Sequence, residues 1–217
     1  MRFQPIALIL MLALLVSNSC QNRKSESECF PGKSEQLGTF KMTKSKFLPG
    51  KFFDDVNIVD KVDTDYASIM NGLKESSLLT VLDSDDEEVY RFVWLRSFDN
   101  PISLRIQKSF AKILINIKEH ELGNDDNFGA LIVDRKKDVS IPEWINFKKL
   151  LAKECFWTLD IGKDLIGIDG SVWILEAKKE NRYHVVYRRS PERGNFRAAC
   201  LYLLELSELN INESKIY

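Results

Sequence analysis

In the middle of the chain, the pattern of side chains repeats every two residues, as in a β-strand. Successive residues of Arg91–Ser97 would point to opposite sides of a strand, and both sides carry apolar side chains. This pattern is typical of a strand buried on both faces. The turn-forming residues Phe98–Pro101 follow this strand. Further short apolar segments come next, at Ile102–Gln107, Lys112–Lys118 and Leu131–Asp134. Four successive strands with short connections predict an antiparallel meander.

The pattern changes to that of a helix after the meander. Ser140 and Glu143 have the spacing of a capping box. In this motif the side chain of each residue accepts a hydrogen bond from the backbone N–H of the other at the start of a helix. Apolar residues then follow at helical spacing, at Trp144, Phe147 and Leu151. This pattern predicts a helix that runs to about Cys155 and buries these side chains.

A second pair of strands and a final helix complete the chain. Val172–Ala177 and Tyr183–Arg188 have the pattern of a hairpin, and Phe196–Leu209 carries a continuous apolar band. The predicted fold is therefore α+β, with an antiparallel sheet of about six strands and two main helices packed on one face. The sheet consists of the meander and this C-terminal hairpin.

The start of the chain has the order of parts of an export signal. Arg2 precedes the apolar run Ile6–Val16, whose length of about eleven residues is too short for a helix that crosses a bilayer. Small polar residues follow and end at Cys20. This segment resembles a bacterial lipoprotein signal, in which Cys20 would be the first mature residue and would be lipidated. Ser17 and Ser19 also fit ordinary secretory cleavage, which leaves secretion without an anchor as the alternative.

The signal divides the chain into three predicted parts. Residues 1–19 are the signal peptide, residues 20–46 are a polar tether lipidated at Cys20, and residues 47–217 are a single α+β domain. The predicted location is the cell envelope, with the protein anchored to a membrane on the periplasmic or surface side. If Cys20 is not acylated, the protein is secreted.

Composition agrees with a folded domain and argues against a nucleic-acid partner. Hydrophobic residues make up 44% of the chain and aromatic residues 11%, which favours a packed core over a disordered stalk. Removing residues 1–19 takes away one basic residue and no acidic one, so the net charge changes from −1 to −2. Nucleic-acid binding would require a basic stripe or a strongly basic domain.

The chain has four cysteines, at positions 20, 29, 155 and 200. Cys155 and Cys200 both fall in apolar periodic stretches, so they could form a disulfide with each other or remain buried free thiols. Cys29 lies in the polar tether and has no predicted partner.

Basic residues on the strands are the main candidate for a binding face. If the two hairpins lie side by side, several of them would converge with a carboxylate and a histidine on one open face of the sheet. The residues concerned are Arg91, Arg96, Arg105, Glu176, His184 and Arg188. Arginine forks suit carboxylate or phosphate groups, so an anionic ligand or an envelope protein is the expected partner. Cross-strand pairing with nearby carboxylates is the simpler alternative.

No catalytic or metal-binding motif is recognisable in the sequence. His120 and His184 lack the spacing of an HExxH zinc site, and Ser171 lacks the GxSxG turn that would present it to His184. The acidic run Asp83–Glu88 lacks the glycine and glutamate of an EF-hand loop, so we interpret it as a solvated turn. We expect neither a cofactor nor a metal.

Two stretches carry a resemblance to other proteins. They are Arg91–Ile106 (RFVWLRSFDNPISLRI) and Gly167–Pro191, which contains DGSVWILE and YHVVYRRSP and is followed by the CLYLLELS helix. These stretches are similar to those of a family of uncharacterised exported bacterial proteins and lipoproteins. The resemblance implies that the strands belong to one domain, and it implies no activity, cofactor or catalytic residue.

The leading hypothesis is a lipid-anchored envelope protein that binds or scaffolds and does not catalyse. One alternative is an envelope hydrolase that uses Glu176, His184 and an arginine on the sheet face. A third candidate is an immunity-type or inhibitor protein that masks a partner enzyme through an exposed loop, either Gly123–Gly129 or Lys178–Arg182. An enclosed cleft lined by the strand residues would favour the hydrolase.

Overall fold

The structure is a computed structural model that describes Cys29, Phe47 and residues 66–80, 87–110, 112–122, 129–162, 170–180 and 182–217. The predicted signal peptide, Cys20, and most of the acidic run and of the Gly123–Gly129 loop lie outside the described residues.

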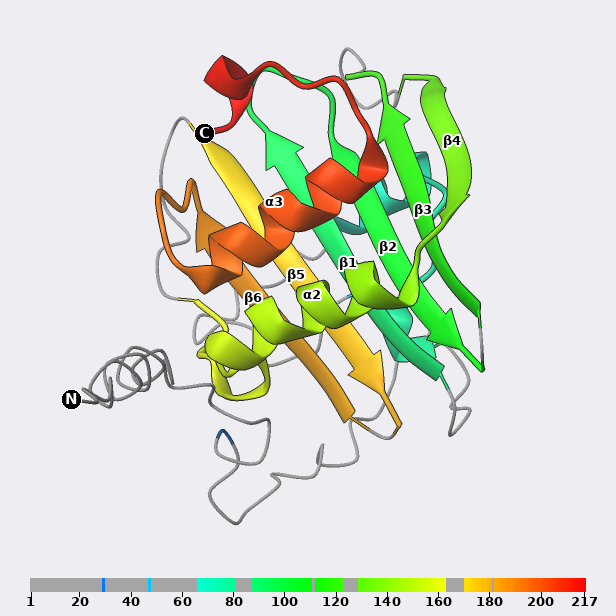
Figure 1. Ribbon diagram of the computed structural model, residues 1–217. Coiled ribbons are helices and arrows are strands. Elements are labelled where there is room, and N and C mark those ends of the chain that lie inside the picture. Colours follow the sequence, from blue (N-terminus) through cyan, green and yellow to red (C-terminus); the bar gives the residue numbers. More distant parts are fainter. Residues whose placement is uncertain are drawn as a thin grey trace, which may run out of the picture.

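Six antiparallel strands form one sheet in the order β4-β3-β2-β1-β5-β6 (Figure 1). The strands are β1 (Glu87–Arg96), β2 (Ile102–Ser109), β3 (Lys112–His120), β4 (Leu131–Asp138), β5 (Ser171–Lys179) and β6 (Arg182–Arg189). The first four strands pair in chain order as a meander, and β5 then pairs with β1 on the side away from β2. The predicted α+β fold is confirmed.

Strand β1 lies in the centre of the sheet and is buried on both faces, as its pattern predicted. Tyr90, Phe92 and Trp94 point to one face and belong to the larger apolar cluster. Val89 and Val93 point to the other face and belong to a second, smaller cluster. Because side chains alternate along a strand, this central position requires apolar residues at successive positions.

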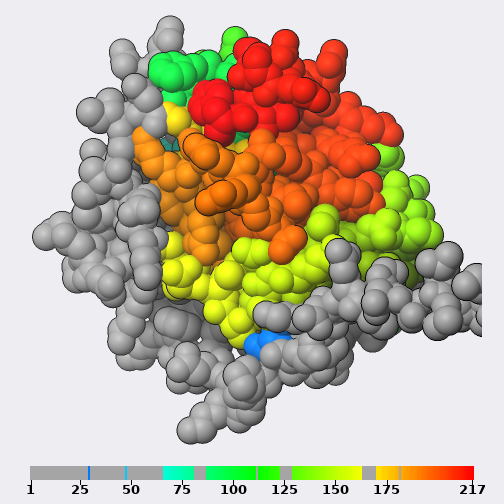
Figure 2. Space-filling view, turned by 60° about the vertical axis from the view of Figure 1, so that its left-hand side comes forward, coloured from blue at the N-terminus to red at the C-terminus, as the bar shows by residue number. Residues whose placement is uncertain are grey.

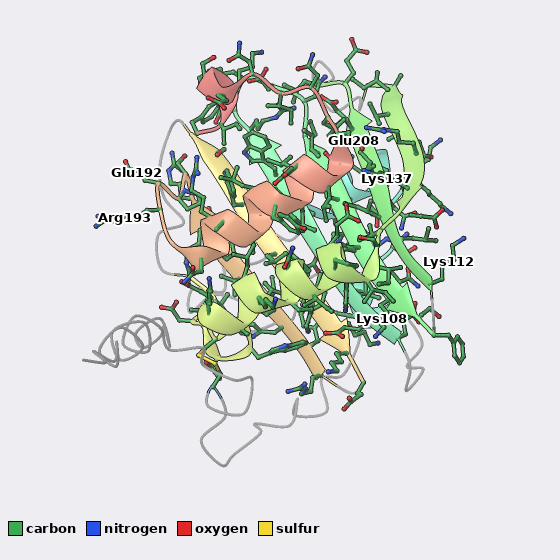
Figure 3. The ribbon with its side chains drawn as sticks, in the orientation of Figure 1. Lys108, Lys112, Lys137, Glu192, Arg193 and Glu208 are labelled. Atoms are coloured by element: carbon green, nitrogen blue, oxygen red, sulfur yellow. A yellow bond between two sulfur atoms is a disulfide. The ribbon has the colours of Figure 1, made fainter. Side chains whose placement is uncertain are left out.

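Two helices cover one face of the sheet (Figure 1). They are α2 (Ile141–Lys153) and α3 (Asn195–Ser207), and they pack against each other. Ser140 and Glu143 form the predicted capping box at the start of α2. Lys137 on β4 pairs with Glu208 just beyond α3, which joins the end of this helix to the sheet (Figure 3). The two main helices therefore pack on one face, as predicted.

The other face of the sheet is covered by residues 66–80. Residues 66–72 are helical, and a short 3-10 helix, η2 (Leu78–Thr80), follows. Tyr66, Met70, Leu73 and Leu78 are at most 2% exposed and join the second apolar cluster. This layer places a second set of buried contacts on the face opposite α2 and α3.

None of the helices in the described part of the chain is long and apolar enough to cross a membrane.

Candidate functional site

A buried ion pair joins the neighbouring strands β1 and β5 on the face covered by residues 66–80. The register of β1 and β5 places Arg91 directly opposite Glu176, and both side chains are fully buried. Arg91 Nη2 lies 2.6 Å from Glu176 Oε2, and Arg91 Nε donates a hydrogen bond of 2.7 Å to the same oxygen. The Tyr66 hydroxyl donates to Oε2 at 2.8 Å and the Tyr183 hydroxyl donates to Oε1 at 2.7 Å. Glu176 therefore meets donors on both carboxylate oxygens.

A second carboxylate, that of Glu75, lies among three cations beside this pair. Its Oε2 is 3.1 Å from Arg105 Nε and 3.5 Å from Arg91 Nη1, and its Oε1 is 3.0 Å from Lys118 Nζ. Arg91 also donates to the Ser76 carbonyl at 2.6 Å. We call Glu75, Arg91, Arg105, Lys118 and Glu176 the ionic cluster. It connects β1, β2, β3 and β5 to the segment 66–80.

Protonation in the cluster follows from burial and charge. Burial and the negative charge of Glu176 raise the pKa values of the Tyr66 and Tyr183 hydroxyls well above the ordinary value, so both remain donors. Burial opposes the positive charge of Arg91, but Glu176, Tyr66 and Glu75 together raise the pKa of its guanidinium. Arg91 stays charged, and its charge is compensated within the protein.

In the ionic cluster, the arginines pair with carboxylates of the protein itself. Of the predicted face, the structure brings together Arg91, Arg105 and Glu176. It adds Glu75 and Lys118, which the pattern of the strands did not single out. Arg91, Glu75 and Glu176 are buried, so they are not placed to receive an anionic ligand from solvent. The arrangement performs the cross-strand and interlayer pairing that was the simpler alternative, and it acts as a structural link.

The remaining three predicted residues lie on the face covered by α2 and α3. The Arg96 guanidinium lies 4.7 Å from the centroid of the Trp94 ring and 3.2 Å from Glu119 Oε1. Arg188 pairs with Asp160 at 2.9 Å. The six candidate residues therefore lie on both faces of the sheet, three on each.

His184 lies in an aromatic environment on this same face. The register places His184 opposite Ala177, so its side chain and that of Glu176 point to opposite faces. Its ring packs edge-on against Phe156 with a centroid distance of 5.1 Å. Burial lowers the pKa of His184 to about 4, so the imidazole is neutral at physiological pH. Because the sheet separates it from Glu176, the two side chains cannot act together as an acid–base pair.

A disulfide joins Cys29 to Cys155 across a sequence separation of 126 residues. Cys155 follows the end of α2 in a left-handed conformation, with φ at 50°, and Cys29 is 6% exposed. The disulfide considered between Cys155 and Cys200 does not form, because the Cys155 sulfur is bonded to Cys29. Cys200 is a free thiol on the buried side of α3, and burial raises its pKa. Cys29 therefore belongs to the folded domain, although the polar sequence around it predicted a tether.

The described residues contain no group of three or more histidine, cysteine, aspartate or glutamate side chains that could hold a metal ion. No protein-family model matches the chain, and no curated protein matches it. The similarity to uncharacterised exported bacterial proteins stays a prediction.

Proposed function

We propose that this chain is an exported, lipid-anchored protein of the bacterial envelope whose folded domain binds or scaffolds a partner without catalysing a reaction. The observation that carries the proposal is the Cys29–Cys155 disulfide. Disulfides form and persist in oxidising compartments and are rare in the cytosol. The bond thus agrees with the export that residues 1–20 predict.

The position of Cys29 also agrees with the predicted processing. Cys29 comes nine residues after Cys20, so cleavage before Cys20 keeps the disulfide in the mature protein. Two or more acyl chains on Cys20 would hold the domain stably on a membrane, whereas one chain gives only reversible binding.

The non-catalytic role is supported by the positions of the candidate acid–base groups. Glu176 is fully buried among internal donors, and His184 lies on the opposite face of the sheet with a lowered pKa. The hydrolase alternative, which required these two side chains together, loses its support.

A second candidate, a protein that masks a partner enzyme, is favoured by two exposed apolar side chains. Phe98 and Leu122 are 71% and 46% exposed. Both lie at the end of the sheet where β1 turns into β2, since the Leu122 N–H donates to Asn100 Oδ1 at 3.0 Å. Exposed apolar side chains in a group are a common feature of protein-binding surfaces.

Mass spectrometry of the mature N-terminus tests the anchor. Native protein from the envelope should begin at an acylated Cys20. The Cys20→Ser variant should carry no lipid and should no longer be found in the membrane fraction. A mature chain that begins at Gln21, or at an unmodified Cys20, would overturn the anchor.

Crosslinking in intact cells tests the binding role. Phe98→Asp should abolish the crosslink to a specific envelope protein, because it places a charge in the apolar contact. Phe110→Asp is a matched control, because Phe110 is similarly exposed, at 77%, and lies in the β2–β3 turn at the opposite end of the sheet. Equal loss in both variants, or no specific crosslink to the native protein, would count against a binding surface at Phe98.

A further inference from the structure

We propose that the Cys29–Cys155 disulfide shortens the tether and so holds one end of the domain, formed by the end of α2 and the start of β6, next to the membrane. The partner of this end is the lipid surface that carries Cys20. The inference rests on the lipid anchor proposed above and adds the orientation and the reach of the domain.

The length of the tether follows from the numbering. The nine residues from Cys20 to Cys29 span at most about 30 Å when fully extended, and a flexible chain of this length has a root-mean-square reach of about 15–18 Å. Without the disulfide, the next described contact along the chain is Phe47, which packs against Tyr66 at a centroid distance of 6.2 Å. The tether would then contain 27 residues, with a reach of about 26–31 Å.

The disulfide also selects which end of the domain is close to the membrane. Cys29 is bonded to Cys155, just beyond the end of α2. Figure 2 shows α2, in yellow-green, lying along α3, in orange and red, and Figure 3 draws a disulfide at the end of α2. Arg182, at the start of β6, lies 4.7 Å from the ring centroid of Trp157, so β6 begins at this same end. Strands β1 and β6 run in the same direction, because both are antiparallel to β5. The turn after β1, with Phe98, therefore lies at the far end of the sheet.

The size of the sheet separates these two ends by the length of a strand. Strand β1 has ten residues, which corresponds to about 33 Å. The proposed arrangement therefore turns Phe98 and Leu122 away from the lipid, where a partner protein could reach them.

The charges beside the disulfide suit a lipid surface. Lys149 and Lys153 on α2 are exposed, and lysines near a membrane are attracted to anionic headgroups. Of the acidic residues at this end, Glu154 accepts a hydrogen bond from the Asn195 N–H at 3.2 Å and Asp160 pairs with Arg188, whereas Glu180 between β5 and β6 is exposed. Trp157 is partly buried close to Arg182, and tryptophan favours the membrane interface.

Two insertions of equal length test the proposal in the full lipidated chain on a supported bilayer. One variant receives 27 glycine and serine residues between Ser27 and Glu28, before Cys29. Its matched control receives the same insertion between Ser34 and Glu35, after Cys29. Neutron reflectometry then measures the distance between the domain and the bilayer.

The first insertion should raise the domain by about 15–18 Å, because it doubles the root-mean-square reach of the tether. The control insertion should leave the distance unchanged, because the disulfide bypasses it. In a Cys29→Ser, Cys155→Ser background both insertions should raise the domain equally. Equal shifts in the disulfide-bonded protein would overturn the inference and leave the anchor intact. Protein that does not stay on the bilayer would overturn the anchor, and with it this inference.

Discussion

Strands β1 and β5 carry different side chains on their two faces. On the face covered by α2 and α3 they present the apolar residues Phe92, Trp94, Trp173 and Leu175. On the face covered by residues 66–80 they present the Arg91–Glu176 pair. Apolar packing is non-directional and tolerates substitutions that keep volume. A buried ion pair is costly to desolvate and depends on the presence of both partners. The two faces should therefore respond differently to single and to paired substitutions.

The largest effect is expected from removing one partner of the buried pair. Glu176→Leu should lower the free energy of unfolding by about 3–5 kcal/mol, because the buried Arg91 loses its closest carboxylate and keeps only Glu75, at 3.5 Å. The double variant Arg91→Met, Glu176→Leu should recover part of this loss in urea unfolding, because it removes the buried charge but still leaves the Tyr66 and Tyr183 hydroxyls without their acceptor. A double variant as unstable as the single one would show that the second face does not depend on charge compensation.

A cavity on the apolar face should cost somewhat less and should not depend on charge. Leu203→Ala in α3 removes a fully buried side chain and should lower the free energy of unfolding by about 3 kcal/mol. Leu203→Met, which nearly keeps the volume, should cost less than about 1.5 kcal/mol. Both values should be the same in low and in high salt. A clear salt dependence of either free-energy change would contradict the expected difference between the two faces.

The tyrosine hydroxyls sharpen the comparison, because they separate hydrogen bonding from packing. Tyr66→Phe and Tyr183→Phe each remove one donor to the Glu176 carboxylate and should each cost about 1.5–3 kcal/mol. Tyr202→Phe on the apolar face serves as the control and should change the unfolding free energy by less than about 0.5 kcal/mol. Equal costs for all three variants would remove the special role of the second face.

The smallest expected effect is a loss of stability at acidic pH, caused by His184. The pKa of His184 is about 4 in the folded protein, against an ordinary value of 6.5, so the unfolded chain binds more protons between these pH values. Its contribution to stability is complete above pH 6.5 and is lost as the pH falls toward 4. The loss between pH 6.5 and 5.5 should be about 1 kcal/mol, and His184→Gln should lack it. A variant with the same pH dependence as the native protein would contradict the assignment.

The elements were predictable because their signals are local. The alternation in Arg91–Ser97 and the capping box of Ser140 depend only on neighbouring residues, and both predictions are confirmed. The larger apolar cluster follows from the same patterns, since each strand shows which side chains share a side.

The relations between distant residues were not predictable in this way. Whether His184 shares a face with Glu176 depends on the register of β5 and β6, and a shift of one residue reverses the answer. The partner of Arg91 depends on β5 pairing with β1, which are far apart in the chain. Which cysteine pairs with Cys155 likewise depends on the position of Cys29 beside the end of α2. The sequence near Cys29 does not predict this position.

Non-reducing mass spectrometry of the native protein from the envelope tests the central claim most directly. The account predicts a mature chain that begins at an acylated Cys20, with Cys29 linked to Cys155 and Cys200 free. An unmodified N-terminus, or Cys29 and Cys155 recovered as free thiols, would contradict it.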